Sequence, residues 1–117
     1  ILPYESSDVD SNFHIYTLQV KQNKKFDRYD LYMGLRKKNY QPMVHYIPIH
    51  FFSYYQNKYG FKRGDFPIAE NYYDCALTIP LYPGLTDYEV DQVIADVKNV
   101  VDLLKTNLWG RNNIYRD

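Results

Sequence analysis

The chain has 117 residues and a mass of 14.1 kDa, with 14 lysines and arginines balanced by 14 aspartates and glutamates. The length indicates one domain, and the neutral charge argues against a dedicated nucleic-acid binder, which normally carries a basic excess. No apolar run approaches the ~20 residues that span a bilayer, so we expect no transmembrane helix. The single cysteine, Cys75, excludes an internal disulfide and a cysteine-built zinc site, and it fits a reducing compartment.

The first part of the chain is predicted to be a polar entry segment followed by a strand and a helix. Residues 1–12 are polar and acidic after an early proline, whereas residues 13–20 (FHIYTLQV) are rich in the aromatic and branched side chains typical of a strand. A helix is expected over residues 28–38. Asp27 and Asp30 place acid at its start and three basic residues close it, which suits the helix dipole.

The middle of the chain alternates extended and helical patterns. Residues 42–49 (PMVHYIPI) predict an extended segment, which its two prolines limit to an edge or irregular strand. A short aromatic helix is expected over residues 50–60, ending at a glycine. Another helix should begin at Pro67 and run to about residue 76, and residues 77–84 (LTIPLYPG) predict a third short strand closed by a Pro-Gly turn.

The strongest helical pattern is the last one, over residues 87–104. Thr86 and Glu89 have the spacing of a capping box, in which each side chain satisfies the other's backbone N–H group. An apolar stripe then recurs with helical period and should face the sheet: Val90, Val93, Ile94, Val97, Val100, Val101 and Leu104. Residues 105–117 form a tail without periodicity.

These elements predict an α+β fold, an α/β sandwich in which a short sheet is packed by a long C-terminal helix. Three short strands and two long helices make a small unit for an independent enzyme. We therefore expect a domain over residues 13–104 that packs against another domain or protein. An entry segment, residues 1–12, precedes it, and the tail follows it.

Candidates for chemistry concentrate in the segment HYIPIH, residues 45–50. His45 and His50 are four residues apart, which is not a standard zinc spacing, and no third ligand clusters with them, so we expect no metal site. A histidine on its own is commonly a hydrogen-bonded structural residue. Pro48 between them stiffens the backbone, and a rigid loop with two histidines and one tyrosine suits ligand binding.

Other patterns leave alternatives open. The basic run from Lys21 to Lys38 suits phosphate or nucleic acid, but also a solvated helix face. The tyrosine-rich stretch 46–59 suits stacking on a base or sugar, but equally packing at an interface. We find no P-loop, no nucleophile elbow and no histidine near Cys75, so no catalytic residue is assigned.

The segments HYIPIH and GDFPIAENYYDCALTIPLYPGLTDYEVDQVI carry a family resemblance. Together with the strand SNFHIYTLQV they resemble the C-terminal small domain of the DegT/StrS family of nucleotide-sugar aminotransferases. The resemblance runs in order from Ser11 to Leu104. Within the family, the residues of these motifs are most similar to those of the transaminases of pseudaminic-acid biosynthesis.

The resemblance implies a fold-type I aminotransferase that depends on pyridoxal phosphate. In such enzymes the large N-terminal domain carries the lysine that binds the cofactor, and none of the nine lysines here has that sequence context. The isolated chain is therefore expected to be inactive and to bind no cofactor. By position in the family motif, the implied substrate-binding residues are His45, Tyr46, Ile47, Pro48, Ile49 and His50.

The implied reaction is transfer of an amino group from glutamate to C4 of a UDP-4-keto-6-deoxy sugar, in surface-glycan or flagellin-glycan biosynthesis. The implied partners are the nucleotide sugar, the missing large domain and a second subunit of a homodimer. No nucleic acid or membrane is expected to bind, and the implied location is the cytoplasm. Two alternatives stand beside this interpretation: a stand-alone, non-catalytic sugar-binding module and a protein-interaction module of the same fold.

Overall fold

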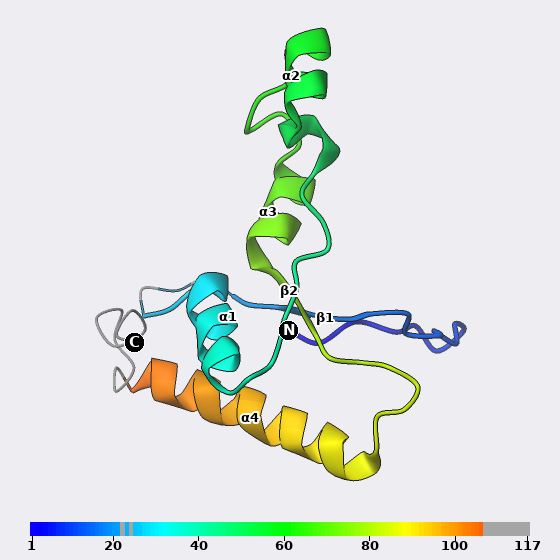
Figure 1. The fold of residues 1–117 in the computed structure, drawn as a ribbon. Helices are drawn as coiled ribbons and strands as arrows, with labels where there is room; N and C mark the ends of the chain where they lie inside the picture. The colour runs from blue at the N-terminus through cyan, green and yellow to red at the C-terminus, as the bar shows by residue number, and fades with distance from the viewer. Residues whose placement is uncertain (22, 24, 107–117) are drawn as a thin grey trace.

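The computed structural model describes residues 1–21, 23 and 25–106, so most of the predicted tail lies outside the described residues. Over these described residues, four α-helices, one 3-10 helix and two strands follow one another in the predicted order, except that the predicted strand over residues 42–49 is not formed. Figure 1 shows their arrangement. Their bounds are β1 (Tyr16–Gln19), α1 (Arg28–Lys37), η1 (Ile49–Phe51), α2 (Ser53–Tyr59), α3 (Pro67–Cys75), β2 (Ala76–Ile79) and α4 (Asp87–Lys105).

The sheet is a single antiparallel pair of β1 and β2, with Tyr16 opposite Ile79 and Thr17 opposite Thr78. The hydroxyls of the two threonines are 2.9 Å apart across the strands. The predicted second strand is reduced to one bridge, in which the backbones of Met43 and Thr78 exchange N–H···O bonds of 3.0 and 2.8 Å. The prolines that flank this bridge lack the N–H donors that would extend the ladder.

Both long helices begin at the predicted acid or threonine caps. The Thr86 hydroxyl accepts the Glu89 N–H, and the Glu89 carboxylate accepts the Thr86 N–H, which confirms the capping box of α4. At α1 the Asp27 carboxylate accepts the N–H groups of Tyr29 and Asp30. No helix in the described part of the chain, α4 included, is long and apolar enough to cross a membrane.

One hydrophobic core forms where α1 and α4 pack together beneath the sheet (Figure 1). Its buried members come from both helices, from β2 and from the β1–α1 connection: Val20, Phe26, Leu31, Leu35, Leu77, Val100 and Leu104. The predicted stripe of α4 therefore reaches the core through its C-terminal half. Its N-terminal half is less covered, since Ile94 remains exposed beside a hollow of about 480 Å3 between α4 and the sheet.

A polar contact joins the end of α1 to the middle of α4. Asp96 accepts hydrogen bonds from the Lys38 ammonium at 2.6 Å and from the Tyr40 hydroxyl at 2.9 Å. These donors hold the pKa of Asp96 below its ordinary value. Burial, together with the bond to Asp96, raises the pKa of Tyr40 to about 12, so both links persist across the neutral range.

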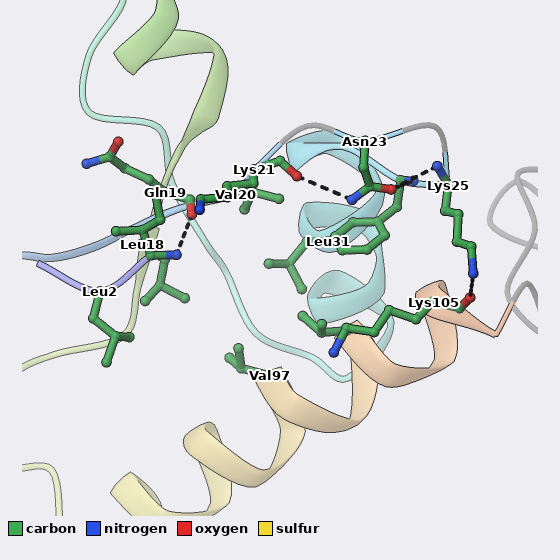
Figure 2. A pocket seen from close by; sticks show the side chains of 13 residues that line it. Leu2, Leu18, Gln19, Val20, Lys21, Asn23, Lys25, Leu31, Val97 and Lys105 are labelled. Carbon is green, nitrogen blue, oxygen red and sulfur yellow. Dashed lines mark hydrogen bonds between the residues drawn. The ribbon is translucent and has the colours of Figure 1, made fainter.

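A groove of about 810 Å3 opens between the first residues of the chain, β1, α1 and α4. Figure 2 shows Leu18, Leu31 and Val97 along its wall and the Lys25 side chain crossing to the Lys105 carbonyl, a bond of 2.9 Å. The backbone N–H of Gln19 also bonds the Ile1 carbonyl at 2.9 Å. The groove lining is mainly apolar, with lysine and amide groups at its rim.

The segment 45–75 extends away from this core as an arm that contains η1, α2 and α3 (Figure 1). Helix α2 buries none of its residues, and Ile68 on α3 is 87% exposed. The radius of gyration is 16.4 Å, whereas a compact domain of this length has about 13 Å. The arm therefore depends on local contacts for its shape.

Substitution of Val100 by aspartate tests the core. Val100 is fully buried, so an unpaired carboxylate there should lower the free energy of unfolding by roughly 3–5 kcal/mol. Asn99→Asp places the same group at the adjacent exposed position and should cost less than about 1 kcal/mol. Urea denaturation followed by circular dichroism measures both, and equal effects would contradict the assigned core.

Candidate functional site

The predicted binding loop, residues 45–50, leaves the sheet immediately after the Met43–Thr78 bridge and leads into the arm. His45 is fixed at its start, because the Nδ1 atom lies 3.0 Å from the Thr78 hydroxyl. Thr78 is itself buried on β2 and bonded to Thr17. The His45–Tyr46 peptide bond is cis. The sheet thus anchors the first residue of the loop.

The middle of the loop is exposed. Tyr46 is 74% exposed, and its ring lies 4.6 Å from that of His45. Ile47 and Ile49 are exposed as well, while Pro48 is partly covered. Tyr46 and Pro48 border a shallow hollow of about 660 Å3 whose other wall is the start of α3. This part of the loop therefore exposes a hydroxyl and two apolar side chains.

The last loop residue, His50, is buried instead. It is only 6% exposed, and its ring lies between those of Phe51 and Phe66, at 4.3 and 4.7 Å. Its Nε2 atom is 2.9 Å from the Glu70 carboxylate on α3. The sequence placed the two histidines in one binding role, whereas the structure gives them separate anchors, one on the sheet and one in the arm.

Glu70 gathers donors from several segments. The Gly64 N–H lies 2.8 and 2.9 Å from its two oxygens, and the Phe66 N–H lies 3.2 Å from one of them. We call Glu70 with His50, Gly64 and Phe66 the Glu70 clamp. Phe66 precedes α3 and has no side chain able to cap it, so Glu70 in the first turn satisfies that backbone group.

The clamp sets the ionisation of Glu70. Burial acts to raise the pKa of this carboxyl, but the Gly64 N–H, the His50 ring and the Phe66 N–H outweigh it and hold the pKa below the ordinary 4.5. An ionised carboxylate only accepts hydrogen bonds, so the His50 Nε2 atom must donate. His50 is therefore engaged within the protein, and Tyr46 carries the exposed polar group of the loop.

The described residues do not form a site for pyridoxal phosphate. The cofactor needs a lysine amine in a protected pocket, whereas the described lysines are exposed or, for Lys38, partly covered and paired with Asp96. Within the described ranges, no three histidine, cysteine or acidic side chains gather where a metal ion would fit.

The remaining sequence candidates have structural contacts of their own. In the basic run, Lys25 bonds the Lys105 carbonyl and Lys38 bonds Asp96, so two of its cations have partners within the protein. The tyrosine-rich stretch forms a row of ring contacts, with Tyr55 5.2 Å from Tyr54 and 6.1 Å from Tyr59. Cys75 is free and ends α3.

Sequence reasoning missed the two residues that hold the loop, Thr78 and Glu70. Both are far from the loop in sequence, and neither belongs to a motif with a general chemical meaning. The only available signal for Glu70 was a glutamate in the first turn after Phe66-Pro67, where a carboxylate commonly serves the helix start.

Comparison with known proteins places the loop in a wider context. Residues 2–98 match the DegT/DnrJ/EryC1/StrS aminotransferase family. The chain is 40% identical over 103 residues to the spore coat polysaccharide biosynthesis protein SpsC of Bacillus subtilis, covering 86% of this chain and 26% of SpsC. It is 35% identical over 102 residues to an uncharacterized protein, MJ1066, of Methanocaldococcus jannaschii, with coverage of 86% and 26%.

A third relative carries a specific enzymatic name. The dTDP-3-amino-3,6-dideoxy-alpha-D-galactopyranose transaminase of Aneurinibacillus thermoaerophilus is 28% identical over 97 residues, covering 82% of this chain and 24% of that protein. The chain thus spans about a quarter of the length of the curated relatives that it matches.

Acid titration tests the Glu70 clamp. A carboxyl whose pKa is lower in the folded than in the unfolded state contributes stability above the unfolded value, and that stability is lost as pH falls through the folded pKa. We expect the Gly64 and Phe66 amide resonances to shift together with a midpoint below 4.5. Two-dimensional NMR of the chain between pH 7 and pH 2 measures this.

Glu70→Gln is the control for this titration, because it removes the ionisable group and should abolish the coupled shift. A midpoint at or above the ordinary glutamate value of 4.5 would contradict the clamp.

Proposed function

Because the chain belongs to the DegT/DnrJ/EryC1/StrS aminotransferase family, we propose that it is the part of a pyridoxal-phosphate-dependent aminotransferase that positions a nucleotide-activated keto sugar. The observation that carries this proposal is the binding loop. Its exposed residues Tyr46, Ile47 and Ile49 lie between two buried anchors at Thr78 and Glu70. A rigid loop with a hydroxyl and apolar side chains suits a ligand that is partly polar and partly apolar.

The cofactor belongs to the rest of the full-length protein under this proposal. Pyridoxal phosphate supplies the electron-sink chemistry of amino transfer. The lysines among the described residues do not suit it, and the proposal assigns the cofactor-binding lysine to another part of the full-length enzyme. The proposal assigns to this chain the binding and orientation of the sugar, with no catalytic residue of its own.

Each part of the loop then has a task. The Tyr46 hydroxyl forms a hydrogen bond with a polar group of the bound nucleotide sugar. Ile47 and Ile49 cover the apolar face of the 6-deoxy sugar and exclude water around the keto group. Pro48 limits the backbone between them, so that these side chains keep a fixed separation.

The names of the relatives support a sugar substrate: polysaccharide biosynthesis for SpsC and an amino-dideoxy sugar for the transaminase. We propose a UDP-4-keto-6-deoxy sugar aminated at C4, with glutamate as donor, as in the pseudaminic-acid pathway that the motif wording resembles. We also propose a homodimer, in which the exposed arm packs against the large domain and the partner subunit. The reducing compartment suggested by the single cysteine corresponds to the cytoplasm.

The alternative is a non-catalytic sugar-binding or protein-interaction module that keeps the same fold. Such a module would bind a nucleotide sugar or a protein without any amino transfer. The two candidates therefore differ in whether the full-length protein converts keto sugar into amino sugar.

Tyr46→Phe in the full-length protein tests the proposal. It removes one hydroxyl from the exposed part of the loop, so kcat/KM for the keto-sugar half-reaction should fall roughly 5- to 150-fold, the range for one hydrogen bond to a bound polar group. The amino-donor half-reaction should change less, because glutamate is small and contacts little of the loop. Separate rapid-mixing measurements of each half-reaction decide this.

Tyr88→Phe is the matched control, since Tyr88 on α4 is 72% exposed, close to the 74% of Tyr46, and lies away from the loop. If Tyr46→Phe leaves the sugar half-reaction within about twofold of wild type, as the control should, Tyr46 makes no substrate hydrogen bond. A full-length protein that converts no nucleotide keto sugar would favour the non-catalytic module.

A further inference from the structure

We propose that Glu70 is the positioning residue of the binding loop, and that it acts through His50 without touching substrate. This inference rests on the proposed function for the meaning of the loop. The structural part, that Glu70 holds the loop in place, stands on the contacts of the described residues alone.

Both ends of the loop are held by side-chain hydrogen bonds, and the side chains between them are exposed. At its start, His45 bonds the buried Thr78 hydroxyl, and at its end His50 donates to Glu70 at 2.9 Å. Between them, the 3-10 turn is closed by the Phe51 N–H on the Pro48 carbonyl at 2.9 Å and the Phe52 N–H on the Ile49 carbonyl at 3.1 Å. The position of the exposed loop residues therefore depends on both ends.

Near the loop, the other contacts of the arm include the Arg63 guanidinium over the Phe51 ring, at 4.8 Å, and the Phe51–Tyr73 ring pair, at 6.1 Å. Helix α2 buries no residue, and the Arg63–Asp74 ion pair, at 2.9 Å, is largely exposed. Exposed pairs of this kind contribute little. By contrast, Glu70 and His50 are 5% and 6% exposed, and Glu70 also holds the backbone of Gly64 and Phe66.

Stability alone does not explain a buried ionic contact at this place. Burial of a carboxylate is unfavourable unless its donors are complete, and well-packed apolar residues of similar volume are often at least as stable. What the carboxylate adds is direction, because each oxygen accepts donors only at defined positions. Glu70 thereby fixes the loop, the turn before α3 and α3 itself relative to one another.

The experiment uses the full-length protein with Glu70→Gln, and with Asp74→Asn as a matched control. Asp74→Asn breaks the contact between Arg63 in the same turn and α3, and Asp74 itself makes no bond to the loop. Because Arg63 also lies 4.8 Å from the centroid of the Phe51 ring, this variant measures whether that ring contact holds the loop without Glu70. Hydrogen exchange with mass spectrometry follows the Phe51 and Phe52 amides. KM and kcat for the keto sugar, using UDP-linked and dTDP-linked 4-keto-6-deoxy sugars as probes, are measured in parallel.

We expect Glu70→Gln to speed exchange at Phe51 and Phe52 at least tenfold and to raise KM for the keto sugar roughly 5- to 150-fold, the range of one or two lost hydrogen bonds. The amino-donor half-reaction should stay within about twofold of wild type, below that range. Asp74→Asn should leave all of these values near wild type.

Variants of His50 keep the test decisive if Glu70→Gln weakens folding. The Gln amide in His50→Gln keeps a donor where the ring nitrogen stood, so this variant should keep the slow exchange and low KM of the wild type. His50→Leu removes the donor and should show the faster exchange and higher KM expected of Glu70→Gln. Combining His50→Leu with Glu70→Gln should add little, because the two residues act as one unit.

Each contrary result has a distinct meaning. Unchanged exchange at Phe51 and Phe52 in both Glu70→Gln and His50→Leu would overturn the holding role. Faster exchange with a KM no higher than that of Asp74→Asn would overturn the positioning role. If the wild-type protein converts no keto sugar at all, the proposed function fails instead, and the exchange data still decide whether Glu70 holds the loop.

Discussion

The arm of this protein depends on one carboxylate. Glu70 accepts hydrogen bonds from the His50 ring and from the Gly64 and Phe66 amides, so a single side chain joins the binding loop, the turn before α3 and the start of α3. Buried apolar side chains contribute less here than in the core, because α2 buries none of its residues and Ile68 is 87% exposed, and the apolar packing beside Glu70 is limited to ring contacts such as His50–Phe66. Directional hydrogen bonds to Glu70 therefore hold the segments of the arm together, whereas a hydrophobic core does so in the rest of the chain.

The two halves of the chain thus use different physics. Around α1, α4 and the sheet, Leu35, Leu77 and Val100 lose nearly all contact with water. The hydrophobic effect that stabilises this region is non-directional. The arm carries its apolar side chains on the outside. Exposed apolar surface of this kind is commonly a site of contact with another protein surface.

The binding loop lies at the junction of these halves. One end is attached to the sheet through Thr78 and therefore to the core, and the other is attached to the arm through His50. Any movement of the arm relative to the sheet changes the span between the two anchors, and with it the placement of Tyr46. This arrangement links the placement of the exposed loop residues to the packing of the arm.

The sequence by itself determined the helices, the long stripe of α4, its capping box and the family, since these depend on local periodicity and on motifs contiguous in the chain. It also located the loop. Only the tertiary structure decided that the sheet has two strands, that His45 and His50 have different partners, and that Thr78 and Glu70 hold them. These contacts join residues 20 or 33 positions apart, and no local pattern of residue types specifies which distant donor will meet a given acceptor.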